Sequence, residues 1–381
     1  CLLVFFQLNA TSFAFEHEDS DVHFLEYDPN VIQKNRFKKK PYFLLFAAQW
    51  CHWCHVFNEK TLTDEKVISY LNENFVNVFI DADINTSAYQ KYKAKGVPFT
   101  VFLNPDTSEY YKYSGTLYAE PFLEVIQDVI QNVKQGKTVD GEKIFAFEYN
   151  PPTKFNKSTL DNMRNTYIKG VLDNFDTEEY GVGNGIKTIL PETFLYLIKS
   201  TKGENRQDSV LWISETLKKA IENIYDPIEG GFFRYAETDD WDIPHYEKMA
   251  GLNAGTVLLL YKVNEENPNP KFIEVAQQSI HYLSNTLYDE ETGSFLSFQA
   301  ADTSYYFLNE NRRKNVKPPL VISKVFTDHL AVTLTYFLDV LDYSKDNNLE
   351  NKVIHSLDFL SGMILNNKRI YHFYTIKEKQ W

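Results

Sequence analysis

Two cysteines three positions apart, Cys51 and Cys54, are the residues of this sequence best suited to do chemistry, and a histidine follows each of them. The apolar run 42–48 predicts a buried strand before them, and the residues after them, as far as Leu62, predict the start of a helix. The positive end of a helix dipole favours the thiolate form of a nearby cysteine, which is the form that attacks disulfides. We therefore expect Cys51 to be the attacking thiolate, assisted by His52, and Cys54 to be the resolving thiol.

A proline supplies the second part of this candidate redox site. Pro98 lies 44 positions beyond Cys54 (98 − 54), in the stretch Gly96-Val97-Pro98-Phe99, ahead of a second buried strand at 100–103. A strand, a Cys-x-x-Cys at a helix N-terminus and a later Val-Pro before another strand form the thioredoxin layout, in which the proline is cis. A cis proline is rare enough to be a placed feature. Here it would bring the backbone of Pro98 against the sulfurs and leave an edge for an extended substrate.

Other kinds of site share this short motif. Cys-x-x-Cys-His also attaches a c-type haem, but the strands that flank the motif here disfavour a haem protein. Cys51, His52, Cys54 and His55 could together offer ligands to zinc or copper, yet ligands packed so closely along the chain rarely all reach one tetrahedral ion. A buried, inert pair is disfavoured by the imidazoles and indoles around the sulfurs. We expect neither a cofactor nor a metal.

The overall composition excludes several classes of partner. Only three cysteines occur in 381 residues, so no disulfide framework holds the fold together. The net charge of −13 argues against nucleic acid or an anionic membrane surface as the main partner. Beyond the N-terminal segment, no apolar stretch approaches the ~20 residues that span a bilayer, so no integral membrane segment is expected.

The N-terminal segment, residues 1–14, carries no charge and is apolar from Leu2 to Phe6. Small residues, Ser12 and Ala14, stand at positions −3 and −1 of a potential cleavage site, and a strongly polar stretch follows at 16–19. This pattern predicts a signal-peptide remnant and an exported protein, periplasmic or extracellular. The alternative is that the segment forms an N-terminal strand of the folded domain.

The rest of the chain divides by pattern into two domains. Residues 15–140 carry the alternating strands and helices of an α/β thioredoxin-like domain, and residues 156–381 consist of long amphipathic helical runs. The segment between them, 141–155, ends near the pair Pro151-Pro152 and is expected to be a linker.

A repeat is visible in the helical part. Each copy ends a helix with Asp, turns on Gly and enters a short segment led by an aromatic residue. The copies are Asn223-Ile224-Tyr225-Asp226 with Gly230-Gly231-Phe232, Asn285-Thr286-Leu287-Tyr288-Asp289 with Gly293-Ser294-Phe295, and, more faintly, Asn174-Phe175-Asp176 with Tyr180-Gly181. Repeated hairpins of this kind build all-α (α/α) toroids, whose loops gather at one mouth. A toroid of the six-hairpin type needs more chain than this, so we expect it to be partial, incomplete at the C-terminus.

Three motifs taken together resemble a known family. They are Trp50-Cys51-His52-Trp53-Cys54-His55, Gly231-Phe232-Phe233-Arg234-Tyr235 and Trp241-Asp242-Ile243-Pro244-His245-Tyr246-Glu247-Lys248-Met249. In this order they look like the spermatogenesis-associated protein 20 family, and the resemblance covers nearly the whole chain. Those proteins join a thioredoxin-like domain to an α/α six-hairpin barrel similar to that of N-acylglucosamine 2-epimerases and related glycosidases. The resemblance implies fold and domain order, and it leaves the reaction open.

Several positions depart from the family pattern. Leu252 replaces the Asp of an Asp-Asn-Ala segment, Ala300 replaces the Asp of Gln-Asp-Ala-Asp, and His329 stands where the family has Trp. Thr188-Ile189 follow Lys187 in place of Phe-Pro. Two carboxylates and one indole are therefore absent, which weakens acid–base chemistry on a sugar. In the thioredoxin-like half, Leu45 occupies the place of a buried acid, so His52 or His55 would have to transfer the proton at Cys54.

The stretch from Arg234 to Lys248 still concentrates polar chemistry on one predicted loop. Imidazole could act as acid and base, carboxylates could orient it, and an aromatic ring could stack on a sugar. The candidates at the barrel mouth are Arg234, Asp240, Trp241, His245 and Glu247, with Asp302 nearby. The competing interpretation is that His245 and Glu247 hold the loop together while Trp241 plugs the barrel.

We therefore predict a two-domain protein that exchanges thiols and disulfides with partner proteins at Cys51 and Cys54. One alternative is a carbohydrate-active barrel, epimerase- or glycosidase-like, that binds a saccharide and carries the thioredoxin fold as an accessory. Another is a non-catalytic binding scaffold with a metal- or redox-sensing cysteine pair.

Overall fold

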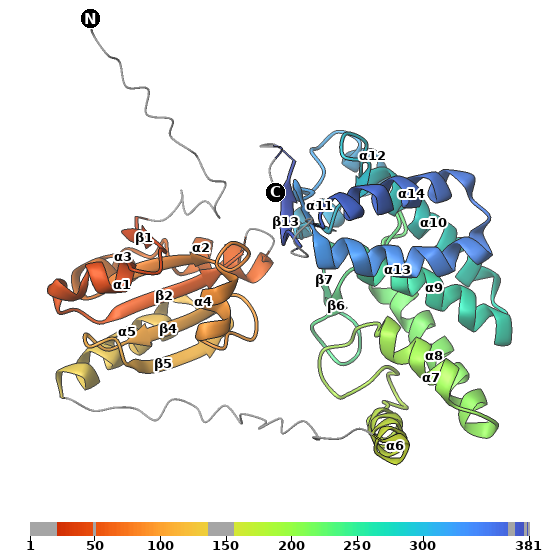
Figure 1. The fold of residues 1–381 in the computed structure, drawn as a ribbon, viewed down its shortest axis with the longest axis horizontal. Helices are drawn as coiled ribbons and strands as arrows, with labels where there is room; N and C mark the ends of the chain where they lie inside the picture. The colour runs from red at the N-terminus through yellow and green to blue at the C-terminus, as the bar shows by residue number, and fades with distance from the viewer. Residues whose placement is uncertain (1–20, 49–50, 136–155, 365–369, 377–378, 380–381) are drawn as a thin grey trace, which may run out of the picture. The chain divides into compact units, whose positions relative to one another are not determined.

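The computed structural model describes residues 21–48, 51–135, 156–364, 370–376 and 379 (Figure 1). The chain separates into two compact units, Cys1–Asn150 and Pro151–Trp381, and each is described by itself. The expected signal-peptide remnant at 1–14 and linker at 141–155 lie outside the described residues. Among the described helices, none is both long and apolar enough to cross a membrane.

The first unit is built on a five-stranded mixed sheet with the strand order β1-β3-β2-β4-β5. Strands β1, β3 and β2 run parallel, and β4 and β5 continue the sheet antiparallel. The strands are β1 (Phe24–Glu26), β2 (Tyr42–Ala47), β3 (Val76–Asp81), β4 (Phe99–Leu103) and β5 (Glu109–Ser114). The helices are α1 (Val31–Lys34), α2 (His52–Lys60), α3 (Glu65–Asn74), α4 (Thr86–Lys91) and α5 (Ala119–Lys134), with a 3-10 turn at Arg36–Lys38.

Helices cover both faces of this sheet, which is why its central strands are continuous apolar runs. Along β2 the side chains alternate, so that Phe43 and Leu45 pack under α2, α3 and α5. Leu44 and Phe46 face the other side, where α1 and α4 lie. Asp64 fixes the start of α3 because its carboxylate accepts hydrogen bonds from two first-turn backbone N–H groups. The arrangement confirms the predicted thioredoxin-like domain.

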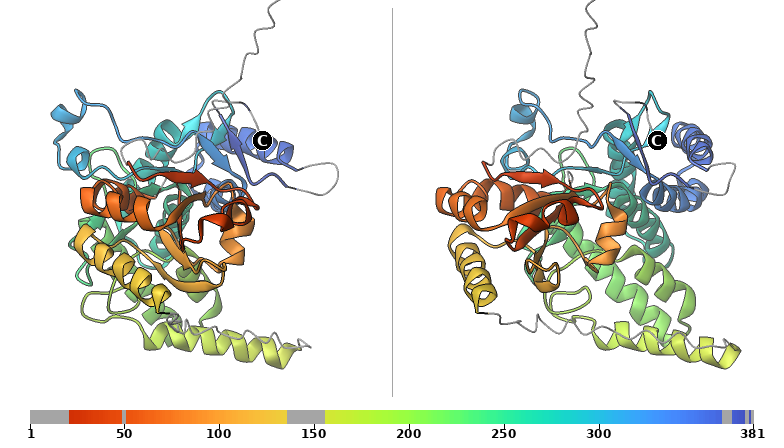
Figure 2. Two further views of the ribbon diagram at one scale, coloured as in Figure 1. Left: turned by 90° about the vertical axis from the view of Figure 1, so that its left-hand side faces the viewer. Right: turned by 60° about the vertical axis from the view of Figure 1, so that its left-hand side comes forward.

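The second unit is a stack of helical hairpins with α9 at its centre, packed against α7, α8, α10 and α13. Helix α6 lies along the outside of this unit (Figure 2), and none of its residues is buried. The helices are α6 (Lys157–Asp173), α7 (Pro191–Ser200), α8 (Glu204–Asn223), α9 (Ala250–Glu266), α10 (Pro270–Thr286), α11 (Thr303–Tyr306), α12 (Glu310–Arg313), α13 (Thr327–Ser344) and α14 (Asn347–Gly362).

A close approach of two of these helices depends on a glycine. A Cβ atom added at Gly255 of α9 would lie 2.7 Å from Cβ of Pro191 at the start of α7. It would also lie 2.9 Å from the ring of Tyr336 on α13. Only hydrogen at this position lets three helices meet so closely.

The predicted repeat is confirmed as a recurring turn. Phe175 pairs with Val182, Tyr225 with Phe232 and Tyr288 with Phe295, each as an antiparallel bridge that closes the Asp–Gly loop after an outer helix. Short two-stranded ladders accompany these turns, and the unit is otherwise helical, as predicted for an α/α fold. The ladders pair β6 (Tyr235–Ala236) with β7 (Pro244–His245), β8 (Lys248–Met249) with β11 (Phe298–Gln299), β9 (Tyr288–Asp289) with β10 (Ser294–Phe295), and β12 (Lys324–Phe326) with β13 (Phe373–Thr375).

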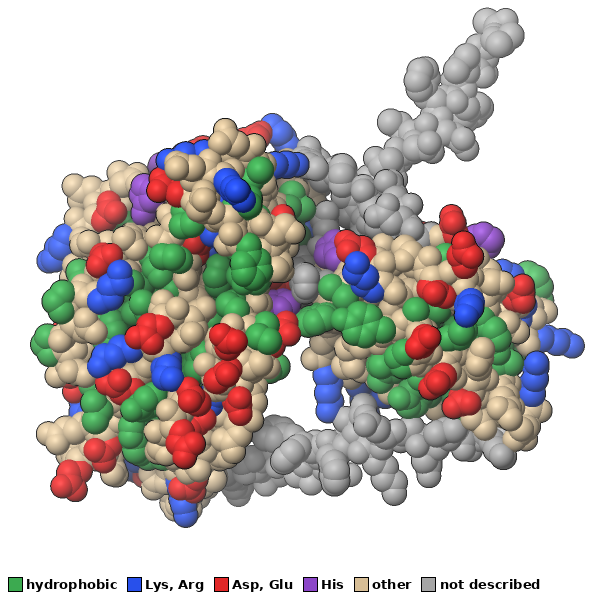
Figure 3. Space-filling view, turned by 180° about the vertical axis from the view of Figure 1, so that it is seen from behind, with side chains coloured by type: hydrophobic (Ala, Val, Ile, Leu, Met, Phe, Trp, Pro, Cys, Tyr) green, Lys and Arg blue, Asp and Glu red, His purple; other side chains and the backbone are tan. Residues whose placement is uncertain are grey.

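Acidic and basic side chains are interspersed on the face of each unit that Figure 3 shows.

Candidate redox site and candidate barrel sites

The cysteine pair lies at the start of α2, the helix that follows β2 in the chain. Cys51 is the N-cap of α2, and the backbone N–H of Cys54 points at its sulfur, with a distance of 3.1 Å from N to Sγ. The two residues are joined by a disulfide, with their Cα atoms 5.2 Å apart. Cys51 and Cys54 are 4% and 2% exposed, so both sulfurs belong to largely buried residues. His52 lies in the first turn of α2.

The predicted proline comes to the same place. The Val97-Pro98 peptide bond is cis, and the carbonyl oxygen of Val97 lies 3.3 Å from Sγ of Cys51. Gly115 donates its N–H to the carbonyl of Pro98 at 2.9 Å, which fixes the proline to the loop after β5. The structure therefore brings together Cys51, Cys54 and Pro98.

Sequence reasoning missed the contribution of that loop. The hydroxyl of Thr116 donates to the carbonyl of Trp53 at 2.9 Å, and the hydroxyl of Thr61 donates to the carbonyl of Leu117. Gly115 takes a φ of +98°, a backbone conformation that favours glycine. In the sequence, the signal for this loop was a glycine between a predicted strand and a predicted helix. The loop is thus hydrogen-bonded to the first turn of α2 and to Thr61 at the C-terminal end of that helix.

Carboxylates also lie at this edge of the sheet, although Leu45 occupies the position of the buried acid of thioredoxins. Asp81 ends β3 beside Ala47 of β2, and Glu26 ends β1. These parallel strands all finish at the edge where the chain leaves for Cys51. Burial, followed by the nearby charge of Asp81, raises the pKa of Glu26 above its usual value.

In the second unit, three of the predicted candidates form one cluster. Arg234 donates from Nη1 to Oε2 of Glu247 at 2.8 Å, and Nε2 of His245 lies 3.8 Å from the same oxygen. The ring of His245 stacks on Tyr235, with the centroids 4.5 Å apart. Burial tends to raise the pKa of Glu247, but the hydrogen bond with His245 and the charge of Arg234 outweigh it and lower that pKa.

The other three candidates lie in separate settings. Trp241 is fully buried, and its indole N–H donates to the carbonyl of Glu179 at 2.9 Å. Asp240 is exposed and accepts from the Thr238 hydroxyl at 2.6 Å, and that hydrogen bond lowers the pKa of Asp240. Asp302 is the N-cap of α11 and accepts from the backbone of Tyr305.

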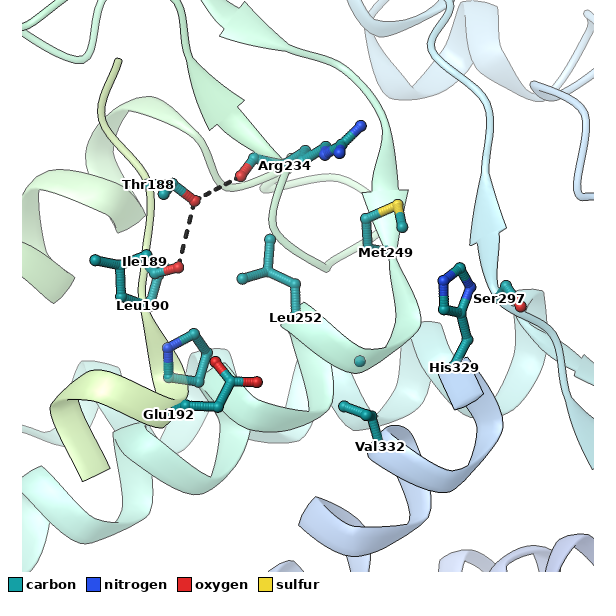
Figure 4. Close-up of a pocket in the computed structure, with 12 residues that line it drawn as sticks. Thr188, Ile189, Leu190, Glu192, Arg234, Met249, Leu252, Ser297, His329 and Val332 are labelled. Carbon is teal, nitrogen blue, oxygen red and sulfur yellow. Dashed lines mark hydrogen bonds between the residues drawn. The ribbon is translucent and has the colours of Figure 1, made fainter. Parts of the chain in front are cut away.

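A cavity of about 330 Å³ opens between the first turns of α7, α9 and α13 (Figure 4). Arg234 is the predicted candidate that lines it, together with Leu252 and His329, which were noted as departures from the family pattern. We call it the three-helix cavity. Its lining is Thr188, Ile189, Leu190, Pro191, Glu192, Arg234, Met249, Gly251, Leu252, Ser297, His329 and Val332. Sequence reasoning missed Glu192; its only signal was the Pro-Glu pair typical of a helix start.

A buried network of charged side chains joins loops of the second unit. Lys248 is fully buried and donates from Nζ to Oδ2 of Asp226 and to the carbonyl of Gly230, both at 2.8 Å. Arg313 donates to both oxygens of the same carboxylate. Burial lowers the pKa of Lys248 to about 8, although Asp226 opposes that shift. The ammonium group also lies 4.5 Å from the ring centroid of Tyr282, a cation–π contact.

Among the described residues, no group of three or more His, Cys, Asp or Glu side chains is arranged to hold a metal ion.

Comparison with known proteins agrees with this architecture. A family model described as "Protein of unknown function, DUF255", and labelled as a DsbH-like thioredoxin, matches residues 6–154. An uncharacterized protein of Caenorhabditis elegans is 25% identical over 61% of this chain and 35% of its own length. Spermatogenesis-associated protein 20 of Rattus norvegicus is 24% identical over 76% of this chain and 40% of its own length. The chain thus spans well under half of the curated relatives that it matches.

Among solved structures, the cellobiose 2-epimerase of Spirochaeta thermophila is 14% identical over 60% of this chain and 61% of its own, with a TM-score of 0.45. The rat protein matches 76% of this chain, which confirms the predicted resemblance to the spermatogenesis-associated protein 20 family.

Proposed function

We propose that the first unit carries out thiol–disulfide exchange with protein partners. The observation that carries the proposal is the placement of Cys51 at the N-terminus of α2 with the cis Val97-Pro98 bond against its sulfur. The helix dipole favours a thiolate at that position. Pro98 positions an extended partner segment so that its disulfide lies in line with Cys51.

In the reduced protein, the thiolate of Cys51 attacks one sulfur of a partner disulfide and forms a mixed disulfide, and the other partner sulfur leaves as a thiolate. The thiolate of Cys54 then attacks Cys51, which yields the Cys51–Cys54 disulfide and releases the second partner sulfur. Two electrons pass to the partner, and the reverse sequence oxidises a partner dithiol. His52 assists by stabilising the thiolate of Cys51.

The test is the rate of alkylation of Cys51 against pH in a Cys1→Ser, Cys54→Ser protein. We expect a pKa clearly below the ~8.5 of a free cysteine, because the helix dipole stabilises the thiolate. A His52→Gln variant should raise that pKa, and a His23→Gln variant, altered at an exposed histidine outside the motif, should not. Titration of Cys51 near the free-cysteine value would contradict the proposal.

A second candidate function is acid–base chemistry on a saccharide in the helical unit. The observation that favours it is the contact of His245 with both Glu247 and Glu237, since Nδ1 lies 3.5 Å from Oε1 of Glu237. An imidazole held between carboxylates can pass a proton to and from a sugar carbon. Exchange of a sugar C2 hydrogen for solvent deuterium, lost in His245→Ala, would establish this activity. If neither unit shows turnover, the protein is a binding scaffold.

We also propose that the protein is exported, on the uncharged apolar segment 1–14 and the small residues Ser12 and Ala14. An exported location provides partner disulfides for Cys51. The N-terminal sequence of the protein recovered from its native cells tests this, because cleavage after Ala14 is expected and a retained segment would contradict it.

A further inference from the structure

The three-helix cavity has walls that are poorly suited to a sugar. Aliphatic side chains dominate the lining, and none of the described residues that line it is Phe, Tyr or Trp. Saccharides are bound by aromatic faces and by many hydrogen-bonding groups. The Thr188 hydroxyl is already committed, since it donates to the carbonyl of Arg234 at 2.8 Å. The volume of about 330 Å³ is at the lower end of the range for ligand pockets.

The polar groups of the cavity favour a negative head group. Helices α7, α9 and α13 all begin here, with Leu190, Met249 and Phe326 as N-caps, and none of these makes a side-chain cap. The positive ends of three helix dipoles therefore lie near one space.

Two charged side chains line the cavity at different places. In the view of Figure 4, Arg234 and Glu192 lie on either side of Leu252. Arg234 uses Nη1 for Glu247, which leaves the other edge of its guanidinium available to a second acceptor. Glu192 is hydrogen-bonded by Tyr336. An anion would therefore be held on the Arg234 and His329 side, away from Glu192.

We propose that the three-helix cavity binds a small monocarboxylate with a branched aliphatic body. The carboxylate contacts Arg234 beside the N-terminal turn of α9, and the body packs against Leu252 and Val332. This site goes beyond the proposed redox function, because it belongs to the other unit and involves neither Cys51 nor Cys54.

The first experiment measures binding of 4-methylpentanoate to the full chain by titration calorimetry. Its neutral analogue, 4-methylpentanamide, and cellobiose are measured in parallel. We expect the acid to bind at least tenfold more tightly than the amide, and cellobiose not to bind. Equal affinity for the acid and the amide, no binding of the acid, or tighter binding of cellobiose would each overturn the proposal.

The second experiment locates the site with matched variants. Leu252→Phe fills the cavity and should weaken acid binding at least tenfold, whereas Leu338→Phe adds the same bulk at an exposed position of α13 and should change nothing. Arg234→Gln should remove the preference for acid over amide, and Arg164→Gln, at an exposed pair, should keep it. Retention of full acid affinity in Leu252→Phe would place the ligand elsewhere and overturn the proposal. Because Arg234 also holds Glu247, thermal unfolding of Arg234→Gln is recorded, and Leu252→Phe decides if that variant fails to fold.

Discussion

Lys187 and Lys248 occupy equivalent positions in successive repeats of the helical unit. Each lies just ahead of an inner helix and pairs with a strand of the next repeat, Lys187 opposite Ala236 and Lys248 opposite Gln299. Each is buried, with Nζ donating to the Asp of the turn in its own repeat. Lys187 reaches Asp176 at 2.6 Å, as Lys248 reaches Asp226. In both repeats, a backbone carbonyl of the same turn accepts a second hydrogen bond from the lysine.

The third repeat keeps the positions and loses the pair. Lys324 lies opposite Thr375 and is 4% exposed, yet its Nζ has no hydrogen-bond partner in the part of the chain that the structure describes. The equivalent carboxylate, on Asp289, accepts instead from the backbone N–H and the hydroxyl of Thr292. The ring of Phe373 faces the ammonium, with its centroid 5.0 Å from Nζ. A repeat therefore preserves its turn geometry without preserving how its buried charge is compensated.

Removal of the Asp226 carboxylate, which Lys248 and Arg313 share, should have the largest effect on stability. Asp226→Asn leaves both Lys248 and Arg313 without their carboxylate, so we expect the free energy of unfolding to fall by about 5 kcal/mol, the upper end for a broken buried pair. Urea unfolding followed by circular dichroism measures it. Asp173→Asn, at an exposed site on α6, is the control and should change stability by less than about 0.5 kcal/mol. If Asp226→Asn lost no more stability than the control, the carboxylate charge would not be needed to compensate Lys248 and Arg313.

Trp241 extends the comparison to the first repeat, because its ring lies over the turn that holds Lys187. A Cβ at Gly181 would lie 3.1 Å from the indole and 3.4 Å from the stem of Lys187. Trp241→Ala should cost about 3–4 kcal/mol, as expected for a fully buried large aromatic side chain. Phe307→Ala, at a ring that is 77% exposed, is the matched control and should be nearly neutral. If Trp241→Ala left stability unchanged but abolished ligand binding, the indole would be a binding residue and not part of the core.

The pH dependence of stability isolates Lys248. Its pKa is about 8 in the folded chain against 10.5 in the reference state, so between these values the unfolded chain binds more protons. Stability contributed by this group therefore rises with pH, by up to about 2 kcal/mol between pH 8 and pH 9.5. Unfolding curves across that window should show the rise in the natural protein, and Lys248→Met should lack it. A parallel pH profile in the two proteins would contradict the assignment.

The smallest effect is expected at Lys324. Lys324→Met removes a buried ammonium that no carboxylate compensates, so stability should stay the same or rise by about 1 kcal/mol. Lys187→Met makes the opposite change, because it strands Asp176, and it should destabilise. Thermal unfolding of the two variants side by side gives the answer. A loss of more than about 1 kcal/mol in Lys324→Met would contradict this expectation.

The parts that could be predicted from the sequence are those that local pattern determines. The apolar strand before Cys51, the helix after it and the Val97-Pro98 step are short-range signals, and the Asp–Gly turn recurs with the same neighbours in each repeat. The buried charge network could not be predicted, because its pairing depends on distant residues: Asp226 meets Lys248, 22 positions on, and Arg313, 87 positions on.

The barrel-mouth candidates show the same limit. Arg234, His245 and Glu247 meet because β6 and β7 pair as a hairpin, which alternation along the chain can suggest. Trp241 turns into the core from a φ of +70°, a backbone conformation that residue type does not predict. The three-helix cavity joins residues from three helix starts far apart in the chain, and only the packing of α7, α9 and α13 defines it.

The close approach at Gly255 has a consequence for how the three-helix cavity can change. Pro191 lines the cavity and rests against Gly255, one helical turn beyond Leu252 on α9. The width of the opening is thus set by a residue that contributes no side chain to it. Any side chain at position 255 forces α7 and α13 away from α9. Substitution there therefore cannot change the spacing of the helices in small steps. A change in the ligand that the cavity accepts therefore has to come from the side chains that line it, such as Leu252 and Val332, while the spacing of the helices stays the same.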